Sequence, residues 1–406
     1  SVSPRRDVIR YGGAVATGGL VAGCAGRSRD ESASPDESAA STGESTPPDT
    51  ETADTGHSAT LSPMGTVEFD SVPETVLTVF SQYADMAVAL GHGDAVNAVY
   101  VPEMSGTTMN QYYHLLDGVS FEWEDLRDPL SDGLSKELLY ELDSDVHLAD
   151  PAWASTQRNW DRSEVEEVDS RIAPWFGNFY SGTRARPPDG YDDYAYYDLW
   201  ELFEGAAGVF DERARYEALV EVHRGLVDTI QRELPPEEDR PTAVRVSVAA
   251  DGESFYTYHL NEPGYWLADT RPLGARDAFA DADWDGLWGQ VDFEAMAEAD
   301  PEVILHLWGI TPARSMAETR SALREHPVGR DLTAVRDGRV YAQGMRYQGP
   351  IMNLFQIEMG AKQLYPELFG EWPTYEDGDR YPEIPAEERL FDRDRVADIV
   401  NGEIHL

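Results

Sequence analysis

The sequence predicts an α/β protein made of two Rossmann-like lobes with mostly parallel sheets, joined by one long rigid helix. Short apolar strand segments alternate with amphipathic helix segments along residues 66–370, which is typical of parallel sheets covered by helices on both faces. One helix–turn–strand phrase occurs twice, and the longest helical pattern lies between its two copies. These three observations indicate two similar lobes with a stiff connection.

The strands and helices of each lobe are predicted from short periodic segments. In the first lobe, residues 75–80 form an apolar strand, residues 82–90 a helix, and residues 95–101 a second strand that ends at Pro102. In the second lobe, strands are expected at residues 243–249, 303–307 and 339–342, and helices at residues 315–324 and 353–364. A last helix is expected in the tail, at residues 393–400.

The internal repeat keeps one offset throughout. Its first copy holds Glu137 in a short helix, an Asp-Ser turn and a buried strand at residues 145–148. The second copy holds Glu294 in a helix, an Asp-Pro turn and a strand at residues 302–305. Helix–turn–strand units are common in α/β proteins, so an accidental match is the alternative.

The connecting helix is predicted over residues 211–234. Its apolar face recurs at spacings of three and four, at Tyr216, Leu219, Val220, His223, Leu226, Val227, Ile230 and Leu234. Asp211 is the expected N-cap and Pro235-Pro236 end the helix. At 1.5 Å per residue it would be roughly 36 Å long, enough to cross from one lobe to the other. An ordinary surface helix of one lobe is the alternative.

The first 24 residues have the features of an export signal. The pair Arg5-Arg6 precedes a short apolar run at residues 11–22, which is too short to span a bilayer by the roughly 20-residue rule. Cys24 follows and is the only cysteine, so it has the position of a lipoprotein acceptor. We expect twin-arginine export, lipidation of Cys24 and a location on the extracellular face of the cell membrane. A chance cysteine behind a hydrophobic N-terminus is the alternative.

The chain after Cys24 is predicted to begin with a disordered acidic tether at residues 25–65. Ser, Thr, Pro, Asp and Glu dominate it, and residues 27–62 contain no large apolar residue before Leu61. The expected order is a signal (1–24), the tether (25–65), the first lobe (66–210), the linker helix (211–234), the second lobe (235–370) and a C-terminal extension (371–406).

The charge balance disfavours polyanionic binding partners. The formal net charge is -44, and Lys136 and Lys362 are the only lysines. Nucleic acid and anionic membrane surfaces are disfavoured, because like charges repel and no basic patch is present. Scarce lysine with abundant acids is also typical of proteins that work in very high salt, where screening weakens self-repulsion.

Several sequence segments resemble the periplasmic-binding-protein family that serves ABC importers of iron-siderophores and cobalamin. The chain resembles a haloarchaeal member of this family. The segments are residues 72–79 leading to 90–96, residues 137–148, residues 290–294 with 300–305, residues 332–341 and residues 364–369. Together they cover residues 66–370, and their order and spacing are more specific than any single phrase. The aromatic insertion at residues 175–197 and the C-terminal extension depart from the family pattern.

The resemblance implies two α/β lobes joined by one helix, with the ligand in the cleft between them. It implies a monomeric solute-binding lipoprotein that delivers an iron(III)-siderophore to an ABC importer permease, with cobalamin or haem as alternatives, without a cofactor or enzymatic activity. The family docks through one glutamate per lobe, and by position these are Glu137 and Glu294. Both also lie at expected helix N-termini, where the helix dipole favours acids, so a structural role is the alternative.

Candidate ligand contacts lie just after strands, because ligands of doubly wound folds bind outside the carboxyl ends of their strands. Aromatic rings offer flat contact area to a bulky chelate, and an arginine could neutralise its anionic oxygens. Each ring taken alone could equally belong to the core or the rim. The candidates are Gln82, Tyr83, Trp153, Trp175, Tyr180, Tyr256, Tyr258, Trp308, Arg346 and Tyr347.

Metal-ligating and catalytic patterns do not stand out. The histidines lack tight ligand spacing, and His147 and His306 lie within strands, where a buried neutral imidazole is expected. No nucleophile–base set or phosphate-binding glycine loop is recognisable. A secreted, salt-adapted hydrolase with an unrecognised active site is the competing functional class.

Overall fold

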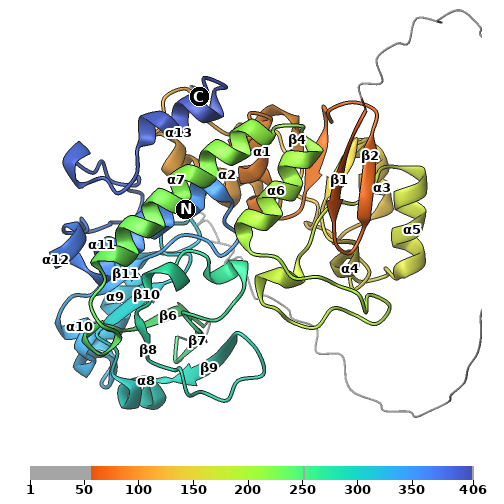
Figure 1. Ribbon diagram of the computed structural model, residues 1–406. Helices are drawn as coiled ribbons and strands as arrows, with labels where there is room; N and C mark the ends of the chain where they lie inside the picture. The colour runs from red at the N-terminus through yellow and green to blue at the C-terminus, as the bar shows by residue number, and fades with distance from the viewer. Residues whose placement is uncertain (1–55, 250–251, 405–406) are drawn as a thin grey trace, which may run out of the picture. The chain divides into compact units, whose positions relative to one another are not determined.

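The computed structural model describes residues 56–249 and 252–404, which belong to one compact unit (Figure 1). The predicted signal, with Arg5-Arg6 and Cys24, lies outside the described residues. Within the described ranges, no helix combines the length and the apolar character needed to cross a membrane.

The fold begins earlier than the sequence predicts. Strands β1 (His57–Leu61) and β2 (Gly65–Phe69) form an antiparallel hairpin, so the predicted tether boundary at residue 65 is wrong for residues 57–65. Ala59 and Leu61 alternate inward and are buried, and the hairpin packs on helix α6 (Leu199–Val209). The sequence does not predict β1, because the helix that covers its buried side chains, α6, lies far along the chain.

The first half, residues 56–210, is built on a parallel three-stranded sheet. Its strands are β3 (Val76–Thr78), β4 (Val96–Ala98) and β5 (Val146–Leu148), in the order β4-β3-β5. All three are shorter than predicted, since pairing ends where the chain turns toward the next helix. The helices are α1 (Ser81–Ala89), α2 (Pro102–Tyr113), α3 (Lys136–Leu142), α4 (Pro151–Ala154), α5 (Arg162–Arg171) and α6.

Helix α7 (Arg213–Glu233) follows the first half and is the predicted linker helix. Its buried residues are Leu219, Val220, Val222, Leu226 and Ile230. It contacts α6 of the first half and the turn Arg271–Leu273 of the second half. The expected N-cap is wrong: Asp211 has a left-handed φ of 53° and Glu212 occupies the cap without a side-chain hydrogen bond.

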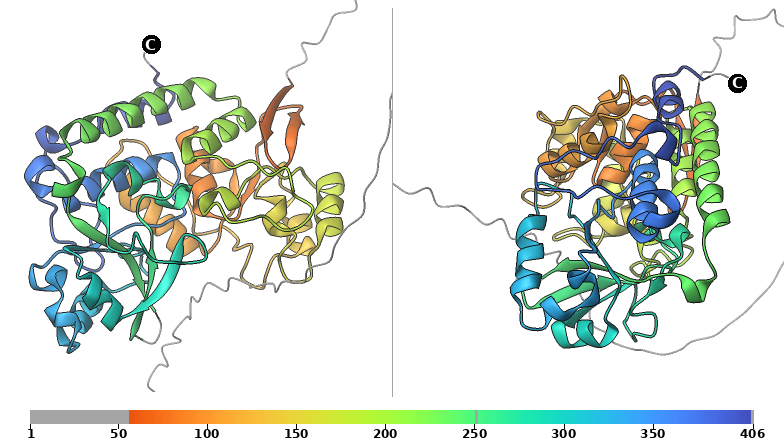
Figure 2. Two further views of the ribbon diagram at one scale, coloured as in Figure 1. Left: turned by 60° about the horizontal axis from the view of Figure 1, so that its bottom comes forward. Right: turned by 90° about the vertical axis from the view of Figure 1, so that its left-hand side faces the viewer.

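The second half, residues 242–349, is built on a larger mixed sheet of order β11-β10-β6-β7-β9, with β8 beside β6. Strands β6 (Thr242–Val248), β8 (Arg276–Asp277), β10 (Val303–His306) and β11 (Val340–Ala342) run parallel. Strands β7 (Ser254–Tyr258) and β9 (Trp288–Asp292) extend the sheet antiparallel. Its helices are α8 (Phe293–Ala299), α9 (Met316–Glu325) and α10 (Thr333–Arg336), and its elements gather below α7 in the left-hand view of Figure 2.

The internal repeat is confirmed in atomic detail. Ser135 caps α3 by accepting a hydrogen bond from the Leu138 amide, and Asp292 caps α8 by accepting one from the Ala295 amide. Each helix then ends at an aspartate in the left-handed region, with φ of 46° at Asp143 and 34° at Asp300. The same caps at both ends give α3–β5 and α8–β10 the same local geometry.

The C-terminal segment contains α11 (Pro350–Leu364), α12 (Pro366–Phe369) and α13 (Arg393–Val400). All fifteen residues of α11 are buried, and the helix packs on α1, α2 and α6 as well as on the second half. The predicted C-terminal extension continues from it as a segment that touches both halves, which we name the C-terminal strap (residues 371–404).

Polar contacts hold the strap on both halves of the molecule. Asp377 accepts hydrogen bonds from the Ser315 hydroxyl (2.5 Å) and the Met316 amide (2.6 Å) at the start of α9. Further along, the Tyr381 amide donates to the Gln111 side chain at 3.1 Å, on α2 of the first half. Helix α13 then packs on α7 and α1. Through Asp377 and Tyr381, the strap therefore connects the two halves without using α7.

Candidate ligand-binding site

The carboxyl ends of the parallel strands bring aromatic side chains from both halves into one cluster. Phe80 follows β3 in the first half, and its ring stacks on Tyr347 of the second half with 4.4 Å between centroids. The same ring contacts Trp153, after β5, at 5.4 Å and Phe179 at 5.2 Å. Aromatic pairs at these separations contribute beyond their buried area, so the rings form a rigid surface where the halves meet.

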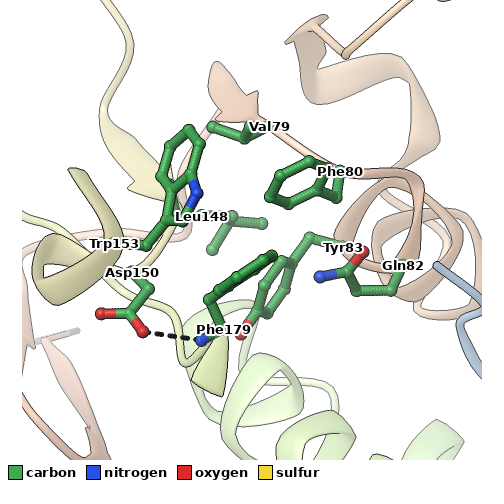
Figure 3. Close-up of a pocket in the computed structure, with 9 residues that line it drawn as sticks. Val79, Phe80, Gln82, Tyr83, Leu148, Asp150, Trp153 and Phe179 are labelled. Carbon is green, nitrogen blue, oxygen red and sulfur yellow. Dashed lines mark hydrogen bonds between the residues drawn. The ribbon is translucent and has the colours of Figure 1, made fainter. Parts of the chain in front are cut away.

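A pocket opens beside this cluster on the side of the first half (Figure 3). Its cavity volume is about 10 Å³, room for about one water molecule and far below the roughly 300–1,000 Å³ of small-molecule sites. Admission of a bulky ligand therefore requires the surrounding groups to move apart. The lining residues are Val79, Phe80, Gln82, Tyr83, Leu148, Ala149, Asp150, Trp153 and Phe179.

Arg346 lies on the second-half side of the cluster, within a group of rings that we name the arginine cage (Tyr258, Trp266, Trp308 and Tyr347). Its guanidinium carbon lies 4.0 Å from the Trp266 ring centroid, 4.9 Å from that of Tyr347 and 5.6 Å from that of Trp308. Arg346 also donates hydrogen bonds to the hydroxyls of Tyr258 (2.9 Å) and Tyr347 (3.0 Å). The cage therefore fixes the guanidinium by cation–π contacts and neutral hydrogen bonds.

No ion pair joins Arg346 to a carboxylate among the described residues. Its Nε is buried and has no hydrogen-bond partner there, and the same holds for Nε1 of Trp266 and Oε1 of Gln82. Buried polar atoms are nearly always satisfied in native proteins. The unpaired Nε–H of Arg346, on a guanidinium without an acidic partner, is therefore suited to a negatively charged ligand.

A buried ionic network holds the cage in place. Asp269 accepts two hydrogen bonds from Arg245, at 3.0 and 2.9 Å, and one from the side-chain Nε2 of Gln348 at 2.8 Å. Arg245 also donates to the backbone carbonyl of Trp266 at 3.0 Å. Gln348 directly follows Arg346 and Tyr347 in the chain. Asp269 therefore orients the segment that carries these two residues and, through Arg245, the backbone at Trp266.

Trp308 has a left-handed backbone, with φ of 68°. This conformation is costly for a bulky residue and persists only where its surroundings impose it. Here the Trp308 amide donates to the carbonyl of Gly344 at 2.9 Å, in the segment that leads to Arg346. In this backbone conformation, the indole of Trp308 points toward Arg346.

The aromatic insertion (residues 175–197) forms the remaining wall. Asp150 accepts hydrogen bonds from the Phe179 amide (2.7 Å) and the Tyr194 hydroxyl (2.5 Å), and burial raises the pKa of this carboxyl to about 6. Figure 3 shows the bond to Phe179 at the edge of the pocket. The Asn178 amide donates to the Tyr83 hydroxyl at 2.8 Å. One buried carboxyl and one tyrosine thus anchor the insertion to the first half.

The insertion meets the second half through a close glycine contact. A Cβ added at Gly182 would lie 2.5 Å from Nε1 of Trp266, and one added at Gly264 would lie 2.4 Å from the carbonyl oxygen of Gly182. Gly264 also has φ of 144°, which other residues rarely adopt. Only glycine allows the insertion to approach Trp266 so closely.

A family model described as periplasmic binding protein matches residues 76–347, about two thirds of the chain. The chain belongs to the periplasmic binding protein family. The match covers the three-stranded sheet, the mixed sheet, α7 and the arginine cage, and ends at Tyr347. The aromatic insertion lies inside the matched range, whereas α11 and the C-terminal strap lie outside it.

Solved structures of periplasmic binding proteins share this fold at low identity. A periplasmic binding protein from Veillonella parvula has a TM-score of 0.53 and 16% identity over 76% of this chain and 97% of its own. Helicobacter pylori CeuE, solved with Ni(II) bound, has a TM-score of 0.52 and 14% identity over 77% and 90%. The heme binding protein HmuT has a TM-score of 0.52 and 16% identity over 76% and 90%. No curated protein sequence matches the chain at a significant level.

The structure brings most of the predicted ligand contacts together. Gln82, Tyr83 and Trp153 line the pocket, and Tyr258, Trp308, Arg346 and Tyr347 form the cage with its arginine. Tyr180 packs edge-on against Phe179, with 5.7 Å between ring centroids.

Two predicted contacts belong neither to the pocket lining nor to the cage. Trp175 is buried in the first half, where its indole donates to the Val165 carbonyl at 3.1 Å and its ring packs on His147. Tyr256 lies on β7 with 38% of its surface exposed and packs edge-on against Trp288.

Four residues of the site were not among the predicted contacts. Phe80 was assigned to the end of a strand, although it occupies the position just after β3 that such folds use for ligands. Phe179 was one of many aromatic residues in the insertion, and Asp150 one of many acids. Trp266 lies just after Pro263-Gly264, a pair that is typical of a turn.

Glu137 and Glu294 occupy equivalent exposed positions in the first turns of α3 and α8. Neither takes part in an ion pair among the described residues. The helices are capped by Ser135 and Asp292, so the glutamates are not needed as caps.

His147 and His306, which are buried within strands, are neutral at ordinary pH. Burial lowers the pKa of both His147 and His306 to about 4. No group of three His, Cys, Asp or Glu side chains suited to a metal ion occurs within residues 56–249 and 252–404.

Proposed function

We propose that this protein is the extracytoplasmic solute-binding component of an ABC importer and captures a metal chelate, an iron(III)-siderophore, at the arginine cage. The observation that carries this proposal is Arg346, a cation surrounded by aromatic rings and free of any described carboxylate partner. A chelate presents anionic oxygens to such a cation and flat ligand arms to the rings. Binding of this kind needs no nucleophile or resident metal.

Names of similar structures agree with this class of ligand. One neighbour belongs to an ABC-type Fe3+-hydroxamate transport system of Saccharomonospora viridis, at a TM-score of 0.50 and 19% identity, and others bind heme or Ni(II). The pocket volume of about 10 Å³ implies that the aromatic insertion or the two halves move when a chelate enters.

The test is tryptophan quenching of the purified protein in molar KCl. The probes are an iron(III) trihydroxamate, an iron(III) tricatecholate, cobalamin and haem. An iron chelate bound at the cage should quench Trp266 and Trp308, which both contact Arg346. Absence of quenching by all four probes would reject the proposal, and a response to cobalamin or haem alone would replace the siderophore with that ligand.

A variant locates the site. Arg346→Gln removes the charge but keeps a polar side chain, and loss of a charge-assisted hydrogen bond of about 1.5–3 kcal/mol should weaken binding roughly 10- to 100-fold. Arg324→Gln, an exposed arginine near the end of α9, is the control and should bind like wild type. Unchanged affinity in Arg346→Gln would place the ligand elsewhere.

Glu137 and Glu294 are proposed to dock the loaded protein on its permease. Their support is the repeat, which gives both halves an exposed glutamate in the same turn of the same helix. An acidic pair complements a permease surface that carries arginines.

Export by the twin-arginine route, lipidation of Cys24 and work in high salt as a monomer complete the proposal. They rest on Arg5-Arg6, on the position of Cys24 and on the net charge of -44. A tether between Cys24 and β1 would keep the binding protein near its permease on the outer face of the membrane.

A further inference from the structure

A second arginine lies near the cage without an acidic partner. Arg314 is in the loop between β10 and α9, is half-buried, and donates to the Ser247 hydroxyl at 3.2 Å. Among the described residues it forms no ion pair, and burial lowers its pKa. In a chain with 76 acidic residues, an arginine that is partly desolvated and kept from carboxylates is suited to an anion from outside the chain.

The hydroxyl partners of the two arginines lie on the same face of the sheet. In the pairing of β6 with β7, Ser247 lies opposite Tyr256 and Arg245 lies opposite Tyr258. Ser247 and Arg245 are two residues apart on β6, and Tyr256 and Tyr258 are two residues apart on β7. Residues two apart on a strand point to the same side and are about 7 Å apart. Arg314 therefore reaches this face at Ser247, near the carboxyl end of β6, and Arg346 reaches it at Tyr258.

Aromatic rings on β7 and β9 cover the same face beside these two positions. The Trp288 ring on β9 lies 5.7 Å from that of Tyr256 and 6.4 Å from that of Tyr258. Tyr256 is one of the few large side chains with apolar surface that the described residues leave exposed. The strands β7 and β9 thus add an open aromatic shelf beside the more enclosed cage.

We propose that Arg314 is a second anion-binding position, so that the chelate presents at least two separate negatively charged groups to the second half while its body rests on Tyr256 and Trp288. This inference rests on the proposed function and narrows its ligand to polyanionic chelates, such as tricatecholates or carboxylate chelates. An uncharged trihydroxamate or cobalamin would cover both arginines without compensating either, which is unfavourable for desolvated cations.

The test compares two iron(III) chelates of similar size, a triply negative tricatecholate and an uncharged trihydroxamate, by tryptophan quenching in molar KCl. Wild type should bind the tricatecholate more tightly. Arg314→Gln should lose about tenfold in tricatecholate affinity and less than twofold in trihydroxamate affinity, while Arg324→Gln binds like wild type. Arg314→Lys keeps the charge and should stay within about threefold of wild type for the tricatecholate.

Each result has a defined meaning. Unchanged tricatecholate affinity in Arg314→Gln would overturn the inference, as would an equal loss for both chelates, which would indicate a change of shape. A preference of wild type for the trihydroxamate would overturn it while supporting the proposed function. Failure of wild type to bind any of the chelates, cobalamin or haem would instead reject the proposed function itself. Thermal melting of each variant confirms that it is folded.

Discussion

Glu358→Gln should destabilise the protein by about 3–5 kcal/mol, because it leaves a buried arginine without its counterion. The Glu358 carboxylate on α11 is fully buried and accepts hydrogen bonds from Arg393 (2.8 Å), the Tyr381 hydroxyl (3.0 Å) and the Leu390 amide (2.8 Å). Arg393 is 2% exposed, and its Nε and Nη1 already lack partners among the described residues. Glutamine keeps the size of the side chain and removes the charge that offsets the guanidinium.

The measurement is urea and thermal unfolding in molar KCl, where a loss of this size should lower the melting temperature by on the order of 5 °C or more. Glu387→Gln, an exposed glutamate of the same strap, is the control and should change stability by less than about 0.5 kcal/mol. The double variant Glu358→Leu with Arg393→Met removes both charges and should recover most of the loss. A loss of unfolding free energy below about 1 kcal/mol for Glu358→Gln would refute the reasoning. A double variant that is less stable than Glu358→Gln would refute it as well.

Three further predictions concern pH, docking and anchoring. Burial holds the pKa of His147 at about 4, below its ordinary value near 6.5, so the stability it contributes is present above pH 6.5 and is lost as pH falls toward 4. The unfolding free energy of His147→Leu, measured by urea titration at each pH, should therefore rise relative to that of wild type by on the order of 3 kcal/mol between pH 7 and pH 4. A difference between the two proteins that stays constant with pH would contradict this. Charge reversal at Glu137 and Glu294 should abolish chelate uptake by cells and leave the dissociation constant of the purified protein unchanged, whereas weakened binding would assign these residues to the pocket. Cys24→Ser should release the protein into the medium, measured by immunoblot of cell and medium fractions, and retention on cells would mean that another segment anchors it.

Much of the fold could be predicted from the sequence because its signals are local. The apolar spacing of α7 needs no knowledge of its neighbours, and the repeated phrases around Glu137 and Glu294 carry their own caps at Ser135 and Asp292. The positions of the strands are predicted for the same reason, but the residues at which the strands begin and end are not. The first strand was missed because Ala59 and Leu61 form a core only with α6, far along the chain.

The candidate site could be predicted only in part. The rule that ligands lie after strands found Trp153, Trp308, Arg346 and Tyr347, since their positions follow from strand ends. Trp266 belongs to a short turn, and its place in the cage depends on a buried ion pair elsewhere and on two glycines that meet across the halves. Contacts of this kind depend on tertiary packing, which no spacing in the sequence encodes.

The position of α11 has a consequence for how the chain is made. All nine residues of α1 are buried, and the helix that packs on them, α11, lies about 270 residues further along the chain. At synthesis rates of about 5–20 residues per second, α1 is complete roughly 15–60 seconds before its cover exists. The apolar surface of the first half is therefore exposed during most of translation, and its core closes only when α11 has been made. A chain with this order of contacts finishes folding after synthesis of its C-terminal helices, so premature termination before residue 364 leaves the first half without its covering helix.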